Sequence, residues 1–261
     1  MRSVVAVIKL TGFAGLILLA VPFQALVLLF CKGSSAYVLP FLWHRGVCRL
    51  LGVKIKVHGT PETGKQVFFV GNHLSYLDIP AIGSVIRGSF VAKKDVESWP
   101  LFGFLSKLQQ TAFISRSRED ATREKTALDH YLSEGKSLIL FPEGTSTDGQ
   151  TVLPFKSSLF SIALREQVHG HLILQPFTVK LVLANGQTPT TQAVRDLYAW
   201  HNEMDTPLHT HLWLFAKSRG AELALVFHQP VRASEYKDRK VLAKVCHEHV
   251  SKGLETDKNT P

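Results

Sequence analysis

The feature that most restricts the fold of this chain is an uncharged apolar run near its N-terminus, LTGFAGLILLAVPFQALVLLFC at residues 10–31. A helix needs about 20 such residues to cross the hydrocarbon core of a bilayer. Basic residues flank the run on both sides, with Arg2 and Lys9 before it and Lys32 after it, so charge does not decide its orientation. We therefore expect an uncleaved membrane anchor.

Two other interpretations of this run concern its processing and its shape. A cleaved signal peptide is disfavoured because the run is long for a signal-peptide core and no A-x-A cleavage site follows it. Pro22 lies in the middle of the run, where it would kink or break a helix, so a single span and a shallow hairpin both stay open. The apolar patch Tyr37–Trp43 suits the lipid interface or caps the core. We assign residues 1–50 to the anchor and this interfacial segment.

Residues 51–261 have the pattern of an α/β domain, in which short apolar runs alternate with amphipathic segments. Strands are predicted at 53–59, 66–72, 89–92, 112–115, 137–141, 172–183 and 222–228. Helices are predicted at 77–86, 100–109, 119–133, 157–166 and 233–251. This order predicts a mixed open sheet with helices on both faces. Residues 185–220 lack clear periodicity, and we expect them to form an insertion over one edge of the sheet.

Charge and cysteine usage narrow the partners of the protein. Lys and Arg total 30 against 21 for Asp and Glu, which gives a formal net charge of +9. This excess favours anionic lipid surfaces, nucleic acid or phosphate-rich molecules, although a solvated basic surface needs no partner. Cys31, Cys48 and Cys246 are far apart, and the close histidine pairs lack the H-E-x-x-H spacing, so we expect no disulfide and no metal site.

The sharpest chemical signal is NHLSYLD at residues 72–78. His73 follows a predicted buried strand, and Asp78 follows five residues later, where a helix should begin. Asp78 would then accept a hydrogen bond from one ring nitrogen of His73, which leaves the other nitrogen free to take a proton from a hydroxyl. Taken alone, the pattern is better explained by a turn histidine and a helix cap.

Three more strand exits carry polar side chains. FPEGTS at residues 141–146 places Glu143 on a turn, where it could grip a hydroxyl or order Arg116, although P-E-G alone is an ordinary turn. AFISR presents Arg116, which suits an anionic head group, and Lys93 and Lys94 leave a fourth strand. Ligands collect beyond the carboxyl ends of strands in an open α/β sheet. The convergence of four such exits therefore predicts a site.

In these motifs the chain resembles the bacterial lysophosphatidate acyltransferase (PlsC-like) family of glycerolipid acyltransferases, over roughly residues 50–185. The family's N-H-x-S-x-x-D block matches residues 72–78. The resemblance implies that His73 is a general base and that Asp78 is its partner.

Three later blocks of the family also match, in the same order. G-x-x-F-I-x-R falls on residues 110–116, which implies that Arg116 binds the acceptor phosphate. F-P-E-G-T is Phe141–Thr145, which implies acceptor binding by Glu143 and Gly144. The late proline block is approximated by L-Q-P-F at 174–177. We add Thr145 and Lys93 to the expected acceptor site.

The chain departs from the family pattern in three places. Gln110 replaces a glycine, Ser146 stands where many lysophosphatidate enzymes have arginine, and the late block has Q-P-F in place of V-P-V. The stretch TSTDGQTVLPFKSSLF at 145–160 resembles a subgroup that includes lyso-ornithine lipid acyltransferases. These departures leave the expected chemistry intact but bear on the identity of the acceptor.

The resemblance implies a membrane-bound O-acyltransferase that uses acyl carrier protein (ACP) or coenzyme A (CoA) thioesters and needs no cofactor. The first expectation for the acceptor is 1-acyl-sn-glycerol-3-phosphate, which would give phosphatidic acid, and the alternative is lyso-ornithine lipid. The catalytic domain would face the cytoplasm at the inner membrane, with no nucleic-acid partner. A basic membrane-tethered binding module would not need His73 and Asp78 together. A hydrolase would need a nucleophile such as Ser75, but no G-x-S-x-G elbow surrounds it.

Overall fold

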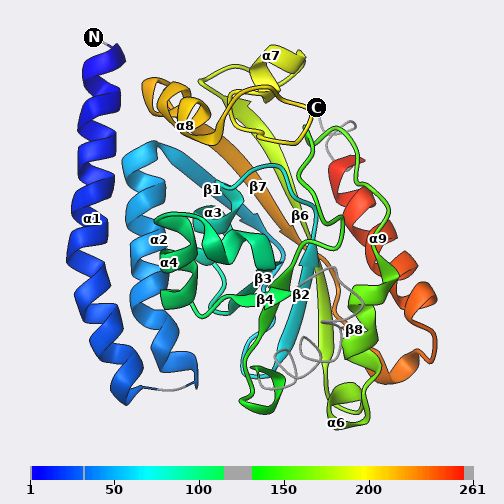
Figure 1. Cartoon of the computed structure of the whole chain (residues 1–261). Helices are drawn as coiled ribbons and strands as arrows, with labels where there is room; N and C mark the ends of the chain where they lie inside the picture. Colours follow the sequence, from blue (N-terminus) through cyan, green and yellow to red (C-terminus); the bar gives the residue numbers. More distant parts are fainter. Residues whose placement is uncertain (1, 32, 115–130, 256–261) are drawn as a thin grey trace.

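The computed structural model describes residues 2–31, 33–114 and 131–255 of the chain (Figure 1). The strands are β1 (Val53–His58), β2 (Val67–Gly71), β3 (Ser89–Lys93), β4 (Ala112–Ile114), β5 (Leu138–Leu140), β6 (Ile173–Ala184), β7 (Ala221–Phe227) and β8 (Val231–Arg232). The α-helices are α1 (Arg2–Phe30), α2 (Val38–Leu51), α3 (Asp78–Gly83), α4 (Phe102–Leu108), α6 (Glu166–His169), α7 (Gln192–Arg195), α8 (Leu208–Lys217) and α9 (Arg239–Glu255). The 3₁₀ helices are η1 (Gly33–Tyr37), η2 (Lys94–Ser98), η3 (Ser157–Leu164) and η4 (Ala233–Glu235).

The strands form one mixed sheet in the order β1-β7-β6-β2-β5-β3-β4, with β8 paired to β6. Strand β2 runs parallel to both β5 and β6, whereas β6 and β7 are antiparallel. The predicted mixed open sheet is therefore confirmed. Val70 of β2 pairs with Leu140 of β5, so the residues that follow these two strands emerge side by side.

Helices cover both faces of the sheet, each over its own hydrophobic core (Figure 1). One core packs residues of α2 and α3 against β2, β6 and β7. The other packs η3 and α9 against β2, β5 and β6. Tyr198 and Phe215 from the segment 185–220 belong to the first core, so this segment contributes to a face of the sheet and does not merely cover an edge.

The local predictions hold for the strands better than for the helices. All seven predicted strands form, with ends that differ by a few residues. The helix expected at 77–86 shortens to α3, and the one expected at 157–166 is the 3₁₀ helix η3. The helix expected at 119–133 lies mostly outside the described residues. Helix α2 was expected only as an apolar patch, yet its buried residues Val47, Cys48 and Leu51 join the first core.

The N-terminal apolar run forms one helix, α1, that continues through Pro22. Of the two shapes that the sequence left open, the structure has the single helix and not the hairpin. Helix α1 is long and apolar enough to cross a membrane, and most of its surface lies outside the protein core. It packs against α2, where a side chain at Gly12 would come within 2.9 Å of Leu50.

Lys9 ties α1 to the rest of the protein. Its ammonium donates to the carbonyl of Leu51 at the end of α2 and to that of Ser218 just after α8, both at 3.0 Å. The last carbonyls of a helix lack partners within the helix, and a lysine there also interacts favourably with the helix dipole. Lys9, expected from sequence only as a charge that flanks the anchor, therefore docks α1 against two other helices.

We expect Lys9→Met to lower the free energy of unfolding by about 1–3 kcal/mol, because two partly buried carbonyls lose their donor. Thermal unfolding of the purified protein in detergent measures this change. Lys54→Met is the matched control, because the Lys54 side chain is 77% exposed and its ion pair with Glu222 should contribute less than about 1 kcal/mol. Equal midpoints for the two variants would contradict the docking role of Lys9.

Candidate active site

The candidate site begins where β2 ends, at Gly71. Asn72 is fully buried and exchanges two hydrogen bonds with the backbone of Val179 on β6, at 2.9 and 2.8 Å. These bonds fix the chain just after the C-terminal end of β2, immediately before His73. Trp200 donates its backbone N–H to the carbonyl of Leu74 at 2.9 Å, so the turn after His73 is held as well.

Four donors converge on the buried carboxylate of Asp78. One of its oxygens, Oδ2, accepts from His73 Nδ1 at 2.7 Å and from the backbone N–H groups of Leu74 and Ser75 at 2.7 and 3.0 Å. The other oxygen, Oδ1, accepts from the hydroxyl of Tyr198 at 2.8 Å. A carboxylate has only acceptor sites, so Nδ1 of His73 must carry the proton in this pair. The second ring nitrogen, Nε2, is thereby left as a base.

The imidazole of His73 is held flat against the ring of Phe141. The ring centroids are 4.1 Å apart and the planes differ by 10°. Phe141 in turn meets Phe177 edge-on, and Phe177 occupies the space that a side chain at Gly71 would need, within 2.4 Å of its Cβ position. His73 keeps 21% of its side chain exposed, so a substrate can reach it.

Glu143 supports the same backbone from the opposite side. One carboxylate oxygen accepts from the N–H of His73 at 2.8 Å, and the other accepts from the N–H of Leu153 at 2.7 Å. Glu143 is 3% exposed, and burial raises its pKa to about 7 against the opposing effect of these two N–H groups. The cavity next to His73 is lined by the neighbours Phe141 and Gly144, whereas the Glu143 carboxylate faces the backbone.

The remaining residues expected in the site have different placements. Gly144, Thr145 and Lys93 all line the cavity that contains His73. Lys94 leaves the same strand end but pairs with Glu97 at 3.1 Å. Arg116 lies outside the described residues.

The segment 185–220 supplies site residues that sequence reasoning missed. Besides Tyr198 on Asp78, the carbonyl of Trp200 accepts from the hydroxyl of Ser146 at 2.6 Å. Asn202 donates to the hydroxyl oxygen of Thr145 at 3.1 Å. The segment has no hydrophobic period, and only its aromatic content marked it as unusual for a surface loop.

Ser75, the nucleophile that a hydrolase would need, is fully buried. Its backbone N–H donates to Asp78 and its hydroxyl oxygen accepts from the N–H of Leu77 at 3.3 Å. Ser75 therefore supports the turn and cannot reach a substrate. Within the described ranges, no three His, Cys, Asp or Glu side chains group as metal ligands would.

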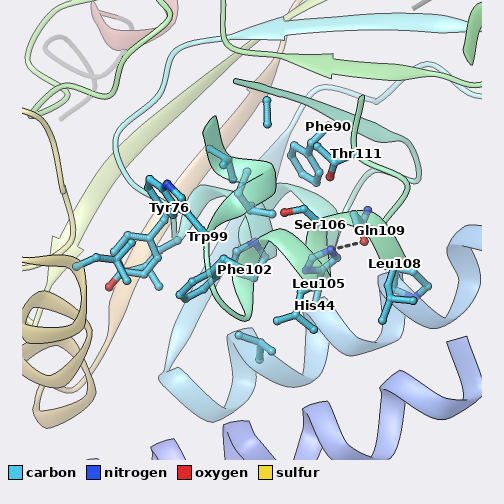
Figure 2. Close-up of a pocket in the computed structure, with 18 of the residues that line it drawn as sticks. His44, Tyr76, Phe90, Trp99, Phe102, Leu105, Ser106, Leu108, Gln109 and Thr111 are labelled. Carbon is cyan, nitrogen blue, oxygen red and sulfur yellow. Dashed lines mark hydrogen bonds between the residues drawn. The ribbon is translucent and has the colours of Figure 1, made fainter. Parts of the chain in front are cut away.

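An apolar cavity of about 420 Å³ extends from His73 between α1, α2, α4 and β3. Figure 2 shows Tyr76, Trp99 and Phe102 grouped along one part of it, and His44 hydrogen-bonded to Gln109 in another. His44 Nε2 and Gln109 Oε1 are 3.0 Å apart, and burial lowers the pKa of His44 to about 4, so this histidine is neutral. Such a cavity suits a long hydrocarbon chain whose reactive end lies at His73.

Comparison with known proteins supports this arrangement. Residues 54–180 match the family model described as Acyltransferase. A lyso-ornithine lipid O-acyltransferase of Brucella abortus is 33% identical over 88% of this chain and 86% of its own length. A 1-acyl-sn-glycerol-3-phosphate acyltransferase of Neisseria meningitidis is 30% identical over 79% of this chain and 76% of its own.

A solved structure has the same fold. The 1-acyl-sn-glycerophosphate acyltransferase PlsC of Thermotoga maritima superimposes with a TM-score of 0.68, at 19% identity, over 100% of this chain and 99% of that one. This structure, at 19% identity, shows the fold alone, whereas the sequence relatives, whose matches cover most of both chains, also show the family. This chain belongs to the PlsC-like acyltransferase family, which includes the lyso-ornithine lipid and 1-acyl-sn-glycerol-3-phosphate acyltransferases.

Proposed function

We propose that this protein transfers a fatty acyl group from a thioester to the free hydroxyl of a lysolipid, with His73 as the general base. The observation that carries the proposal is the hydrogen bond of 2.7 Å between His73 and the buried Asp78, at one end of an apolar cavity. A base fixed beside a hydrocarbon-shaped cavity is what acyl transfer to an alcohol requires.

The proton transfer follows from the tautomer. Nδ1–H of His73 points to Asp78, so Nε2 takes the proton of the acceptor hydroxyl as its oxygen attacks the thioester carbonyl. The C–S bond then breaks, and the imidazolium returns its proton to the leaving sulfur, which departs as a thiol. No acyl-enzyme forms, because the substrate's own alcohol is the nucleophile. The imidazolium is stabilised by the Asp78 carboxylate and by the face of Phe141.

Glu143 is assigned a positioning role in this scheme. Both of its oxygens are engaged by backbone N–H groups, so it fixes the main chain of His73 and does not contact the acceptor. The acceptor is left to Gly144, Thr145, Lys93 and Arg116.

The substrates follow from the cavity and the membrane helix. The cavity would hold the acyl chain of acyl-ACP or acyl-CoA, and no cofactor takes part in the reaction. Membrane association through α1 gives access to lysolipids. Because both donors are water-soluble and cytoplasmic, the domain is assigned to the cytoplasmic side of the inner membrane.

The proposed acceptor is lyso-ornithine lipid, with lysophosphatidate as the second candidate. Relatives with the first activity match more of this chain, and at higher identity, than the Neisseria enzyme does. Ser146, which replaces the family's arginine, also removes a phosphate contact.

Purified enzyme supplied with both lysolipids should acylate lyso-ornithine lipid with the larger kcat/KM. A preference for lysophosphatidate would reverse the assignment of the acceptor but not the reaction type.

His73→Ala should reduce kcat by about 10²–10⁴-fold, because the general base is removed. Asp78→Asn should also reduce kcat strongly, since a neutral amide does not stabilise the imidazolium. Acyl transfer is measured in detergent with the donor and acceptor both saturating. A His73→Ala rate close to that of the wild type would contradict general-base catalysis and favour a non-catalytic lipid-binding module.

The raised pKa of Glu143 predicts that the free energy of unfolding depends on pH. The folded-state pKa of about 7 exceeds the unfolded value of 4.5, so the folded protein binds this proton more tightly. The stabilising effect is complete below about pH 4.5 and is lost as the pH rises through about 7. Relative to Glu143→Gln, which does not titrate, the wild type should lose about 3 kcal/mol of unfolding free energy between about pH 4 and pH 8.

Urea unfolding across this pH range measures the difference between the two proteins. Glu235→Gln serves as the control, because Glu235 is exposed and should give no pH-dependent difference. The wild type and Glu143→Gln differ in their free energy of unfolding. If this difference stays constant with pH, Glu143 does not titrate in this range.

A further inference from the structure

The family's usual cation after the F-P-E-G-T block is missing from this chain, because Ser146 takes its place. The hydroxyl of Ser146 is engaged by the carbonyl of Trp200, so it closes a loop contact. Further along this loop, Asp148 pairs with Arg195 at 3.0 Å. Residues 145–150 therefore offer no positive charge to an acceptor head group.

After this loop the chain returns to the site, where two backbone N–H groups hold it in place. The N–H of Leu153 donates to Glu143 at 2.7 Å, and the N–H of Lys156 donates to the carbonyl of Pro142 at 3.0 Å. Both bonds end on the P-E-G turn that follows β5. Lys156 is thus placed beside this turn although it comes 12 positions after Gly144 in the sequence.

The ammonium of Lys156 lies directly over Gly144. A Cβ atom at Gly144 would be 2.3 Å from Nζ of Lys156, so the ammonium occupies the space that a side chain at Gly144 would take. Gly144 also has a φ of +69°, which other residues rarely adopt. Gly144 and Thr145 line the cavity next to His73. The exposed Lys156 does not itself line this cavity, so its charge lies just outside it, beside Gly144.

We propose that Lys156 is a specificity-determining residue that binds the anionic group of the acceptor head group, in the place of the arginine that Ser146 replaces. This inference rests on the proposed acyl transfer to a lysolipid. The group bound is a phosphate in lysophosphatidate or the α-carboxylate in lyso-ornithine lipid. A lysine ammonium binds either anion as a point charge, whereas arginine favours planar bidentate contacts.

Two other cations at the site are less suited to this role. Lys94 is already paired with Glu97. Lys93, which lines the cavity and is assigned to the acceptor above, belongs to β3, and β5 separates β3 from the strand β2 that leads to His73. Lys156, by contrast, is tied to the turn that holds the His73 backbone through Glu143.

The test uses the full-length protein in detergent and compares Lys156→Met, Lys156→Arg and Lys54→Met with the wild type. Lys156→Met keeps the side-chain length, and it should raise the acceptor KM by at least about tenfold. The donor KM should not change. Lys156→Arg should retain most of the acceptor affinity, and Lys54→Met, on the far β1 edge of the sheet, should match the wild type.

Direct binding separates this inference from the proposed reaction. On the His73→Ala background, lysophosphatidate and lyso-ornithine lipid are titrated separately, with and without Lys156→Met. The acceptor used by the wild type should lose about tenfold in affinity, and the lipid with the larger loss identifies the anion. If the wild type transfers no acyl group, the proposed function fails, but a loss of binding still supports the role of Lys156. Unchanged acceptor binding, or a rise in the donor KM alone, overturns it.

Discussion

The buried carboxylate of Asp78 is the interaction on which the rest of the site depends. It receives four hydrogen bonds, three from the turn between β2 and α3 (His73, Leu74 and Ser75) and one from Tyr198, which lies 120 residues further along the chain. A carboxylate buried in a protein is costly unless its lone pairs are satisfied. Satisfying them here requires both the turn after β2 and the segment that carries Tyr198, so the geometry of His73 depends on contacts between distant parts of the chain.

Glu143 constrains the same histidine from the other side of the chain. Asp78 fixes the ring of His73 and the two N–H groups after it, whereas Glu143 fixes the N–H of His73 itself. Phe141 holds the imidazole plane by stacking against it. Because parallel β2 and β5 are neighbours, one strand brings His73 and the other brings both Phe141 and Glu143. The imidazole is therefore preorganised before any substrate binds.

The sequence was sufficient to predict the parts of this site that depend on short-range pattern. The strand exits at His73 and Glu143 follow apolar runs, and parallel pairing brings such exits together. Tyr198 could not be predicted, because its bond to Asp78 crosses 120 residues and its segment has no period. Lys9 was missed for a related reason, since a single charge beside an apolar run gives no indication of which carbonyls it meets. The turn at Glu143 was predicted, but not that its carboxylate faces the backbone.

Helix α1, which is long and apolar enough to cross a membrane, also lines the cavity. Phe13, Ala20, Val21 and Gln24 line the cavity from α1, and Lys9 fastens the same helix to α2 and α8. Leu18, Phe23 and Leu26 face outward and are exposed, so one side of α1 suits lipid and the other lines the apolar cavity. Detaching α1 would therefore open the cavity that contains His73. Helix, cavity and histidine thus form one connected unit, so in the proposed membrane association the docking of α1 sets the depth of His73 relative to the bilayer.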